Sequence, residues 1–174
     1  MKKIKPTPFQ LAAEVLALLA VIGTAVYLGL IWAGLPEQLP SHFGPDGVPD
    51  AWSGKPILLL FFFLSLGLYL LFTVVELLPR IWNLPISVSE KSKPALYSLT
   101  RTLIGSLKLI SSVGFGWVII ATANARRTGA LFIILLIAAL MASMGTYFIC
   151  SFRISLADAR EALRQGVESD GQGK

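Results

Sequence analysis

Residues 130–152 read ALFIILLIAALMASMGTYFICSF and contain no charged side chain. A membrane-spanning helix needs about 20 mostly apolar residues, because the hydrocarbon layer is about 30 Å thick and a helix rises about 1.5 Å per residue. This stretch is therefore long enough to cross a bilayer. It predicts an integral membrane protein.

Three other apolar stretches have the same property. They are Leu11–Ala33, Ile57–Leu78 and Leu103–Thr122, the last interrupted by Lys108. The whole chain is 55% hydrophobic and only 14% charged, with a mean hydropathy of +0.70, whereas soluble domains are about 25% charged. We therefore predict an all-α fold, an integral membrane four-helix bundle anchored in the lipid bilayer.

The first apolar stretch follows Met-Lys-Lys-Ile-Lys, which is also how a cleaved signal peptide begins. It is longer than the apolar region of a signal peptide, and the best exit site, near Ile31-Trp32-Ala33, lacks the small residue expected three positions before a cut. We expect a retained anchor.

The distribution of cations predicts the orientation. Cations remain in the cytoplasm, and four spans place both termini and the connection 79–102 on one side. That side carries eleven cations, against Lys55, Arg126 and Arg127 on the other. We expect the cell membrane, with both termini cytoplasmic. The eleven are Lys2, Lys3, Lys5, Arg80, Lys91, Lys93, Arg101, Arg153, Arg160, Arg164 and Lys174. Since they lie beside apolar runs, they do not indicate a nucleic-acid partner.

These signals divide the chain into five parts. They are a cytoplasmic N-terminus (1–10), a helical hairpin (11–78) with an outer loop (34–56), a cytoplasmic connection (79–102), two further spans (103–152) and a cytoplasmic end (153–174). Thr7-Pro8 and Pro94 are expected to start helices. Ser155 and Asp158 are expected to cap a short helix that stops at Gly166, before a disordered tail.

Small residues at helical spacing indicate where spanning helices approach each other. Three stripes are expected to point into the bundle: Ala13, Ala17, Ala20 and Thr24; Gly105, Ser112 and Gly116; and Ala138, Ala142 and Gly145. On the cytoplasmic end, Leu156, Ala159 and Leu163 share one face. This face would suit a helix that lies on the membrane surface or docks a partner. The alternative is a solvated helical extension. Cys150 is expected to be a small apolar filler.

Three ionisable residues lie within the spans: Glu14, Glu76 and Lys108. Counted from the inner helix ends, all three lie roughly 6–10 Å deep. This shared level predicts an ion-paired cluster that joins three helices, with Lys108 contacting Glu76 or Glu14. A structural role is favoured over a proton or ion relay.

The outer loop, residues 35–55, holds four of the ten prolines and the only histidine. Pro45-Asp46-Gly47 is a turn signal, and we expect an irregular fold that is neither helix nor simple strand. His42, Asp46 and Asp50 are weak candidates for a metal site, although Asp is also common in turns. No catalytic residue or cofactor is predicted.

This loop resembles a known family. The run LPxxLPSHF, from Leu35 to Phe43, and the run GxPDxWSGK, from Gly47 to Lys55, are similar to the signature of domain of unknown function 1648, a bacterial and archaeal membrane module. The family pattern usually has Asn where this chain has Gly44. The signature positions carried over are His42, Phe43, Gly47, Pro49, Asp50, Trp52 and Lys55.

The resemblance implies a multi-pass envelope protein without an enzymatic reaction. The same module forms the N-terminal part of the sporulation-delaying-protein immunity family, which protects a cell from a secreted toxic peptide. The leading hypothesis is thus a non-enzymatic module whose outer loop recognises an extracellular peptide or a membrane partner protein. The alternative is a small transporter or channel subunit that uses Glu14, Glu76 and Lys108 and needs an oligomer or a water-filled path. A metal-dependent enzyme is the least favoured.

Overall fold

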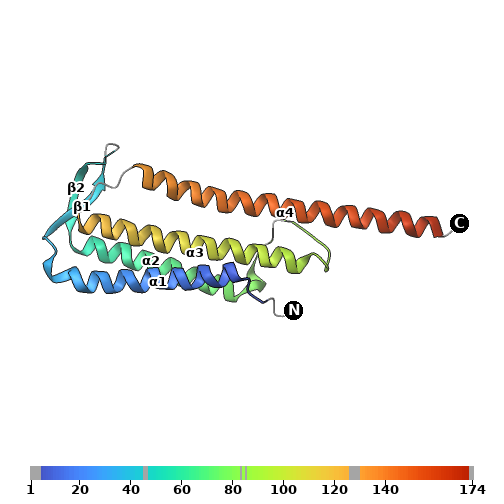
Figure 1. Cartoon of the computed structure of the whole chain (residues 1–174), viewed down its shortest axis with the longest axis horizontal. Coiled ribbons are helices and arrows are strands. Elements are labelled where there is room, and N and C mark those ends of the chain that lie inside the picture. The colour runs from blue at the N-terminus through green and yellow to red at the C-terminus, as the bar shows by residue number, and fades with distance from the viewer. Residues whose placement is uncertain (1–4, 45–46, 83, 85, 126–129, 173–174) are drawn as a thin grey trace.

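The computed structural model of the chain describes residues 5–172, except 45–46, 83, 85 and 126–129. Four long helices run through it: α1 (Pro8–Ile31), α2 (Pro56–Leu77), α3 (Lys93–Ala123) and α4 (Ala130–Gln172) (Figure 1). All four are long and apolar enough to cross a membrane. The predicted spans are therefore confirmed as helices. The cations Lys2, Lys3, Arg126, Arg127 and Lys174 lie outside the described residues.

Two predicted helix starts are present. The Thr7 side chain accepts a hydrogen bond from the backbone N–H of Gln10, whose own side chain accepts one from the backbone N–H of Thr7. This capping box satisfies donors that have no partner within the helix. Pro94 lies in the first turn of α3, where its missing N–H costs nothing.

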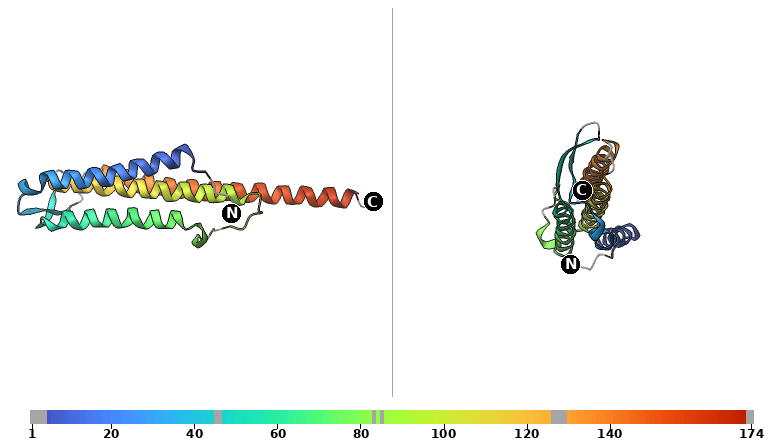
Figure 2. Two further views of the ribbon diagram at one scale, coloured as in Figure 1. Left: turned by 90° about the horizontal axis from the view of Figure 1, so that it is seen from below. Right: turned by 90° about the vertical axis from the view of Figure 1, so that its left-hand side faces the viewer.

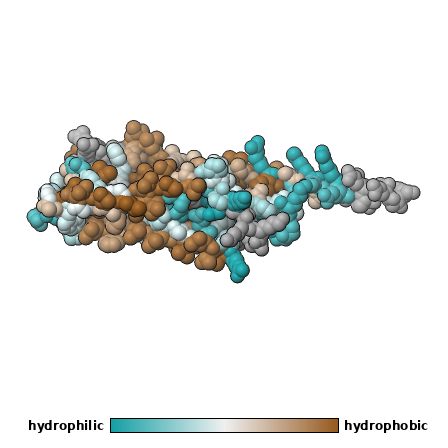
Figure 3. Space-filling view, turned by 60° about the horizontal axis from the view of Figure 1, so that its bottom comes forward, coloured by the Kyte–Doolittle hydropathy of each residue, from teal (hydrophilic) through white to brown (hydrophobic). Residues whose placement is uncertain are grey.

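Helix α3 is the centre of the assembly, because α1, α2 and α4 all pack on it (Figure 2). Its glycines allow the close approach. A Cβ on Gly116 would lie 2.9 Å from Thr24 Oγ1 of α1, and one on Gly114 would lie 2.9 Å from Leu136 Cδ1 of α4. Hydrophobic residues cover much of the bundle surface, and hydrophilic residues gather on the part of α4 that projects beyond it (Figure 3).

Two of the three predicted small-residue stripes face the bundle. Ala13, Ala17 and Thr24 of α1 are buried, and so are Gly105, Ser112 and Gly116 of α3. The prediction for α4 was wrong, because Ala138 and Ala142 are exposed. Helix α4 instead turns Leu136 and Tyr147 toward α3. The small residue at this contact is Gly114, so the close approach needs none on α4.

The C-terminal end also differs from the prediction. Helix α4 continues without a break from Ala130 to Gln172, so there is no separate short helix, no stop at Gly166 and no disordered tail before residue 173. A single glycine inside a helix costs only about 1 kcal/mol, which the longer helix tolerates. Asp158 does not cap α4 but accepts hydrogen bonds from the Ser89 backbone N–H (2.7 Å) and the Ser92 hydroxyl (2.7 Å).

The loop between α1 and α2 is a β-hairpin, not the irregular fold expected from its sequence. Strand β1 (Gln38–Phe43) pairs antiparallel with β2 (Pro49–Gly54). Short 3-10 turns, η1 (Trp32–Gly34) and η2 (Pro79–Ile81), follow α1 and α2. Proline did not prevent pairing because the ladder shifts register between Pro40 and His42, and such a bulge tolerates a residue without an N–H.

Candidate functional site

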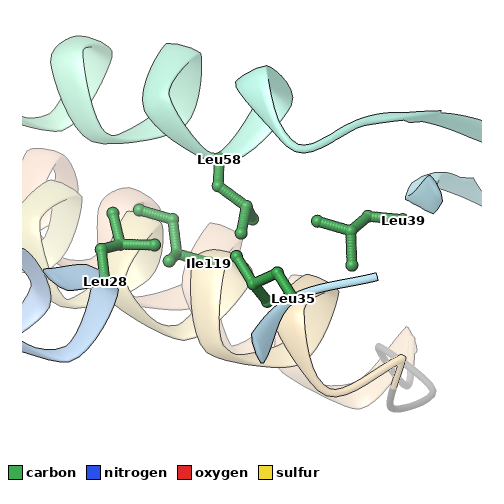
Figure 4. Packing of buried hydrophobic residues seen from close by; sticks show 5 residues of the cluster. All are labelled: Leu28, Leu35, Leu39, Leu58 and Ile119. Atoms are coloured by element: carbon green, nitrogen blue, oxygen red, sulfur yellow. The ribbon is translucent and has the colours of Figure 1, made fainter. Parts of the chain in front are cut away.

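The base of the hairpin is part of the apolar core at the hairpin end of the bundle. Leu35 and Leu39 pack with Leu28 of α1, Leu58 of α2 and Ile119 of α3 (Figure 4). Leu39 and Leu58 are completely or almost completely buried. Burying a leucine contributes roughly 1.5–3 kcal/mol, so this cluster fixes the hairpin to three helices.

The outward part of the hairpin exposes polar and aromatic side chains. The Nδ1 atom of His42 lies 2.5 Å from Oδ1 of Asp50 on the facing strand, and both side chains are largely exposed. Trp52 is 56% exposed. The hairpin therefore exposes an indole, which can stack, and an imidazole that contacts a carboxylate, which can form hydrogen bonds.

The remaining signature residues shape the hairpin. Gly47 has a positive φ of 74°, which favours glycine, and its N–H donates to the Gly44 carbonyl (2.8 Å). The N–H of Gly44 donates to the Val48 carbonyl (2.8 Å), so the backbone at Gly44 helps to close the turn. Lys55 lies 3.2 Å from Glu37 at the base.

Phe43 and Pro49 face each other across the two strands. Both side chains are half-buried. They lie at the ends of the strands beside the turn, so they frame it.

The metal candidates are only partly described. His42 and Asp50 are adjacent, whereas Asp46 lies outside the described residues. Within the described ranges, no group of three or more His, Cys, Asp or Glu side chains is arranged to hold a metal ion. The metal site therefore stays a prediction, because only two of its three candidate ligands, His42 and Asp50, are described.

A second polar cluster lies inside the bundle, far along the helices from the hairpin. Lys108 of α3 is 0% exposed and donates to a carboxylate oxygen of Glu14 on α1 and, at 2.9 Å, to one of Glu76 on α2. The predicted pairing is therefore present, with both carboxylates. A buried charge is tolerated when it is paired and hydrogen-bonded in this way.

Two members of this cluster were missed from the sequence. The Tyr69 hydroxyl donates to Glu14 (2.7 Å), and the Lys108 Nζ lies 5.3 Å from the centroid of the Tyr69 ring. Arg101 Nε donates to Glu76 (2.8 Å). A signal was available for both, because Tyr69 and Arg101 each lie seven residues before Glu76 and Lys108, two helical turns away on the same face. We call these five residues the ion network: Glu14, Tyr69, Glu76, Arg101 and Lys108.

The half of the α1–α3 contact far from the hairpin has a further polar bridge. The side-chain amide of Gln10 donates to the Ser98 carbonyl (2.9 Å) and to the Thr102 hydroxyl (2.8 Å). Gln10 is buried. The half of the bundle far from the hairpin is thus joined by polar contacts, and the half next to the hairpin by the leucine cluster.

Comparison with known proteins identifies the hairpin region. The family model of a domain of unknown function, DUF1648, matches residues 19–67. The chain contains a DUF1648 domain. This domain comprises the second half of α1, the hairpin and the first half of α2, and it includes every signature residue. The ion network lies entirely outside it, since all five of its residues fall beyond residues 19–67.

A relative matches nearly the whole chain. It is an uncharacterized protein of Archaeoglobus fulgidus, 28% identical over 178 aligned residues, which cover 91% of this chain and 97% of that protein. No solved structure gives a significant match. The similarity therefore extends beyond the DUF1648 domain to α3 and α4.

Proposed function

We propose that this multi-pass membrane protein is a non-enzymatic envelope module whose DUF1648 hairpin recognises a peptide or a partner protein outside the cell. The observation that carries the proposal is the contrast within the hairpin. Leu39 is buried against three helices, while His42, Asp50 and Trp52 are exposed on the outward part. Recognition sites are commonly such loops held by a rigid scaffold.

The chemistry of the exposed side chains suits a peptide. Trp is a frequent anchor in protein interfaces, and an exposed strand can pair with an extended peptide through main-chain hydrogen bonds. Strand β2 is a candidate for this pairing, because three consecutive residues of it, Asp50, Ala51 and Trp52, are exposed. Immunity to a secreted peptide is one biological form that this recognition would take.

The proposal places the hairpin outside the cell. Among the described residues, Lys91 and Lys93 lie at the opposite end of the helices from Lys55, in accord with a cytoplasmic connection. In a Cys150→Ala background, a membrane-impermeant maleimide should label Trp52→Cys in intact cells. It should label Lys91→Cys only after permeabilisation. The reverse pattern would refute the orientation.

Crosslinking and pull-down from native membranes test recognition. The intact chain is compared with a His42→Ala/Asp50→Ala/Trp52→Ala variant, which leaves the leucine cluster intact. Glu37→Gln serves as the control, because Glu37 lies in the same loop before β1. We expect the triple variant alone to lose a crosslinked partner. An unchanged set of partners would refute recognition by this face.

Transport is the second candidate. The observation that favours it is that the Glu14 carboxylate, 35% exposed, belongs to a buried ion network, and intramembrane carboxylates often relay protons. Against this, Lys108 contacts both carboxylates, which suits a structural role. Proton flux into vesicles that falls in Glu14→Gln, with folding unchanged, would favour transport, and no flux in the intact protein would dismiss it.

A further inference from the structure

Helix α4 carries an apolar stripe that its own chain does not use. Starting at Leu131, residues with apolar or no side chains recur at alternating intervals of four and three, through ten positions, without a polar residue. This is the 3.5-residue repeat of a coiled coil. The stripe consists of Leu131, Leu135, Ala138, Ala142, Gly145, Ile149, Phe152, Leu156, Ala159 and Leu163.

The stripe lies on the face of α4 that points away from α3. At 3.6 residues per turn, it is about half a turn around the helix from Leu136, Tyr147 and Ser151, which face α3. Apart from Gly145, which is half-buried, every residue of the stripe is exposed. A Cβ on Gly145 would meet no atom within 4 Å among the described residues.

Lipid alone does not account for the whole stripe. Helix α4 continues past Arg153, the first charge after the fourth span, so Leu156, Ala159 and Leu163 lie on the part expected to project into the cytoplasm. Leu163 is 72% exposed. Only a partner that follows α4 from the membrane into water would cover the stripe continuously.

A second copy of the same chain would meet this requirement. Two copies in one membrane share orientation and depth, so parallel α4 helices bring each stripe residue against its own counterpart. In the parallel heptad arrangement, Arg153 faces Phe148 of the other copy and Arg160 faces Ser155, so no like charges oppose each other. An arginine beside an aromatic ring is favourable.

The acidic side chains of the projecting part are engaged elsewhere. Asp158 accepts hydrogen bonds from Ser89 and Ser92, and Glu161 pairs with Lys91 at 2.5 Å. These contacts join α4 to the connection before α3 on the face opposite the stripe. They hold the projecting part in place while the stripe stays accessible.

The contact area is sufficient for a specific dimer. The stripe is about 50 Å long at about 1.5 Å per residue, and helices are about 10 Å wide. It would bury roughly 500 Å² on each copy, so the total reaches the roughly 1,000 Å² expected of a specific interface. The small residues Ala138, Ala142 and Gly145 allow the backbones to approach closely in the membrane.

We propose that the protein forms a parallel homodimer through the stripe of α4, with a two-fold axis along the membrane normal. The stripe of small residues on α4 that does not face its own bundle then faces the other copy. Both hairpins lie on the same side of the membrane, so the dimer presents two recognition faces together.

Disulfide crosslinking of the full chain in native membranes tests the dimer. In the Cys150→Ala background, Ala159→Cys lies on the stripe, whereas Ala157→Cys is equally exposed but lies about a third of a turn from it. We expect at least roughly fivefold more disulfide-linked dimer from Ala159→Cys, since a disulfide needs Cα atoms within about 7 Å. Equal yields, or an adduct of Ala159→Cys with another protein, would overturn the proposal.

A second measurement separates dimer loss from misfolding. Gly145→Leu should be accommodated by the protomer, because a Cβ at this position meets no atom within 4 Å among the described residues, but it would hold two α4 helices apart. We expect the purified protein in nanodiscs to change from two copies to one by single-molecule photobleaching, with an unchanged melting temperature. Two copies per nanodisc in Gly145→Leu, or one copy in the unmodified protein, would contradict the dimer.

Discussion

Replacing Lys108 with methionine would test how the ion network holds the helices together. Methionine keeps the length of the side chain but removes the charge that lies between Glu14 and Glu76. Because Lys108 is 0% exposed and the Glu76 side chain only 13% exposed, water replaces little of the lost contact. The perturbation leaves two carboxylates in an apolar bundle.

The expected cost follows from the partners that remain. Removing one member of a buried ion pair costs about 3–5 kcal/mol. Glu76 keeps Arg101 and Glu14 keeps Tyr69, so the lower end, about 3 kcal/mol, is expected here. For a chain of this size that lowers the melting temperature by roughly 6–12 °C.

Thermal unfolding in detergent, followed by circular dichroism, measures this cost. Lys91→Met is the matched control, because Lys91 pairs with Glu161 at an exposed position, where a pair contributes about 0–1 kcal/mol. A double-mutant cycle with Glu76→Gln should give a coupling above about 1 kcal/mol. If Lys108→Met melted with the control, the network would not stabilise the fold.

Three further changes probe the packing. Gly116→Ala places a methyl group against Thr24 Oγ1 and should destabilise the folded protein by about 1–3 kcal/mol. The control Gly23→Ala, whose methyl group meets no atom within 4 Å among the described residues, should be neutral or stabilising. Equal melting temperatures of the two variants would contradict the close approach of α1 and α3. Leu39→Ala, at a cost of about 2–5 kcal/mol, should speed proteolysis within residues 35–55, and an unchanged rate would mean that the hairpin is held by other contacts. Asp158→Ala should raise amide hydrogen exchange at residues 89–92, which unchanged exchange would refute.

The sequence predicted those features that depend on one helix at a time. Each span could be predicted because its apolar stretch, as a helix, is long enough to cross the hydrocarbon layer. The pairing of Lys108 could be predicted because the depth of each charged residue is counted from the end of its own helix, and the three depths agree. The partners Tyr69 and Arg101 were missed because spacing places them on the same helix faces as Glu76 and Lys108 but does not show which residues of those faces meet.

The two main corrections have the same origin. Helix α4 offered two faces for packing, the small-residue stripe and the face with Tyr147, and only the position of Gly114 on α3 decides between them. The hairpin was missed because proline argues against a strand, while the burial of Leu39 and the bulge after Pro40 are properties of the folded pair. In both places the tertiary contacts, and not the local sequence preferences, determine the structure.

Photocrosslinking from the exposed face of strand β2 tests the central claim most directly. A photoreactive amino acid in place of Trp52, in cells that carry the full chain, should capture a peptide or protein at the outer surface. The same amino acid in place of exposed Leu30 of α1, which lies within the span, should capture lipid. A partner captured at position 52 and not at position 30 is the result expected of a recognition hairpin. Only lipid captured at both positions would contradict it.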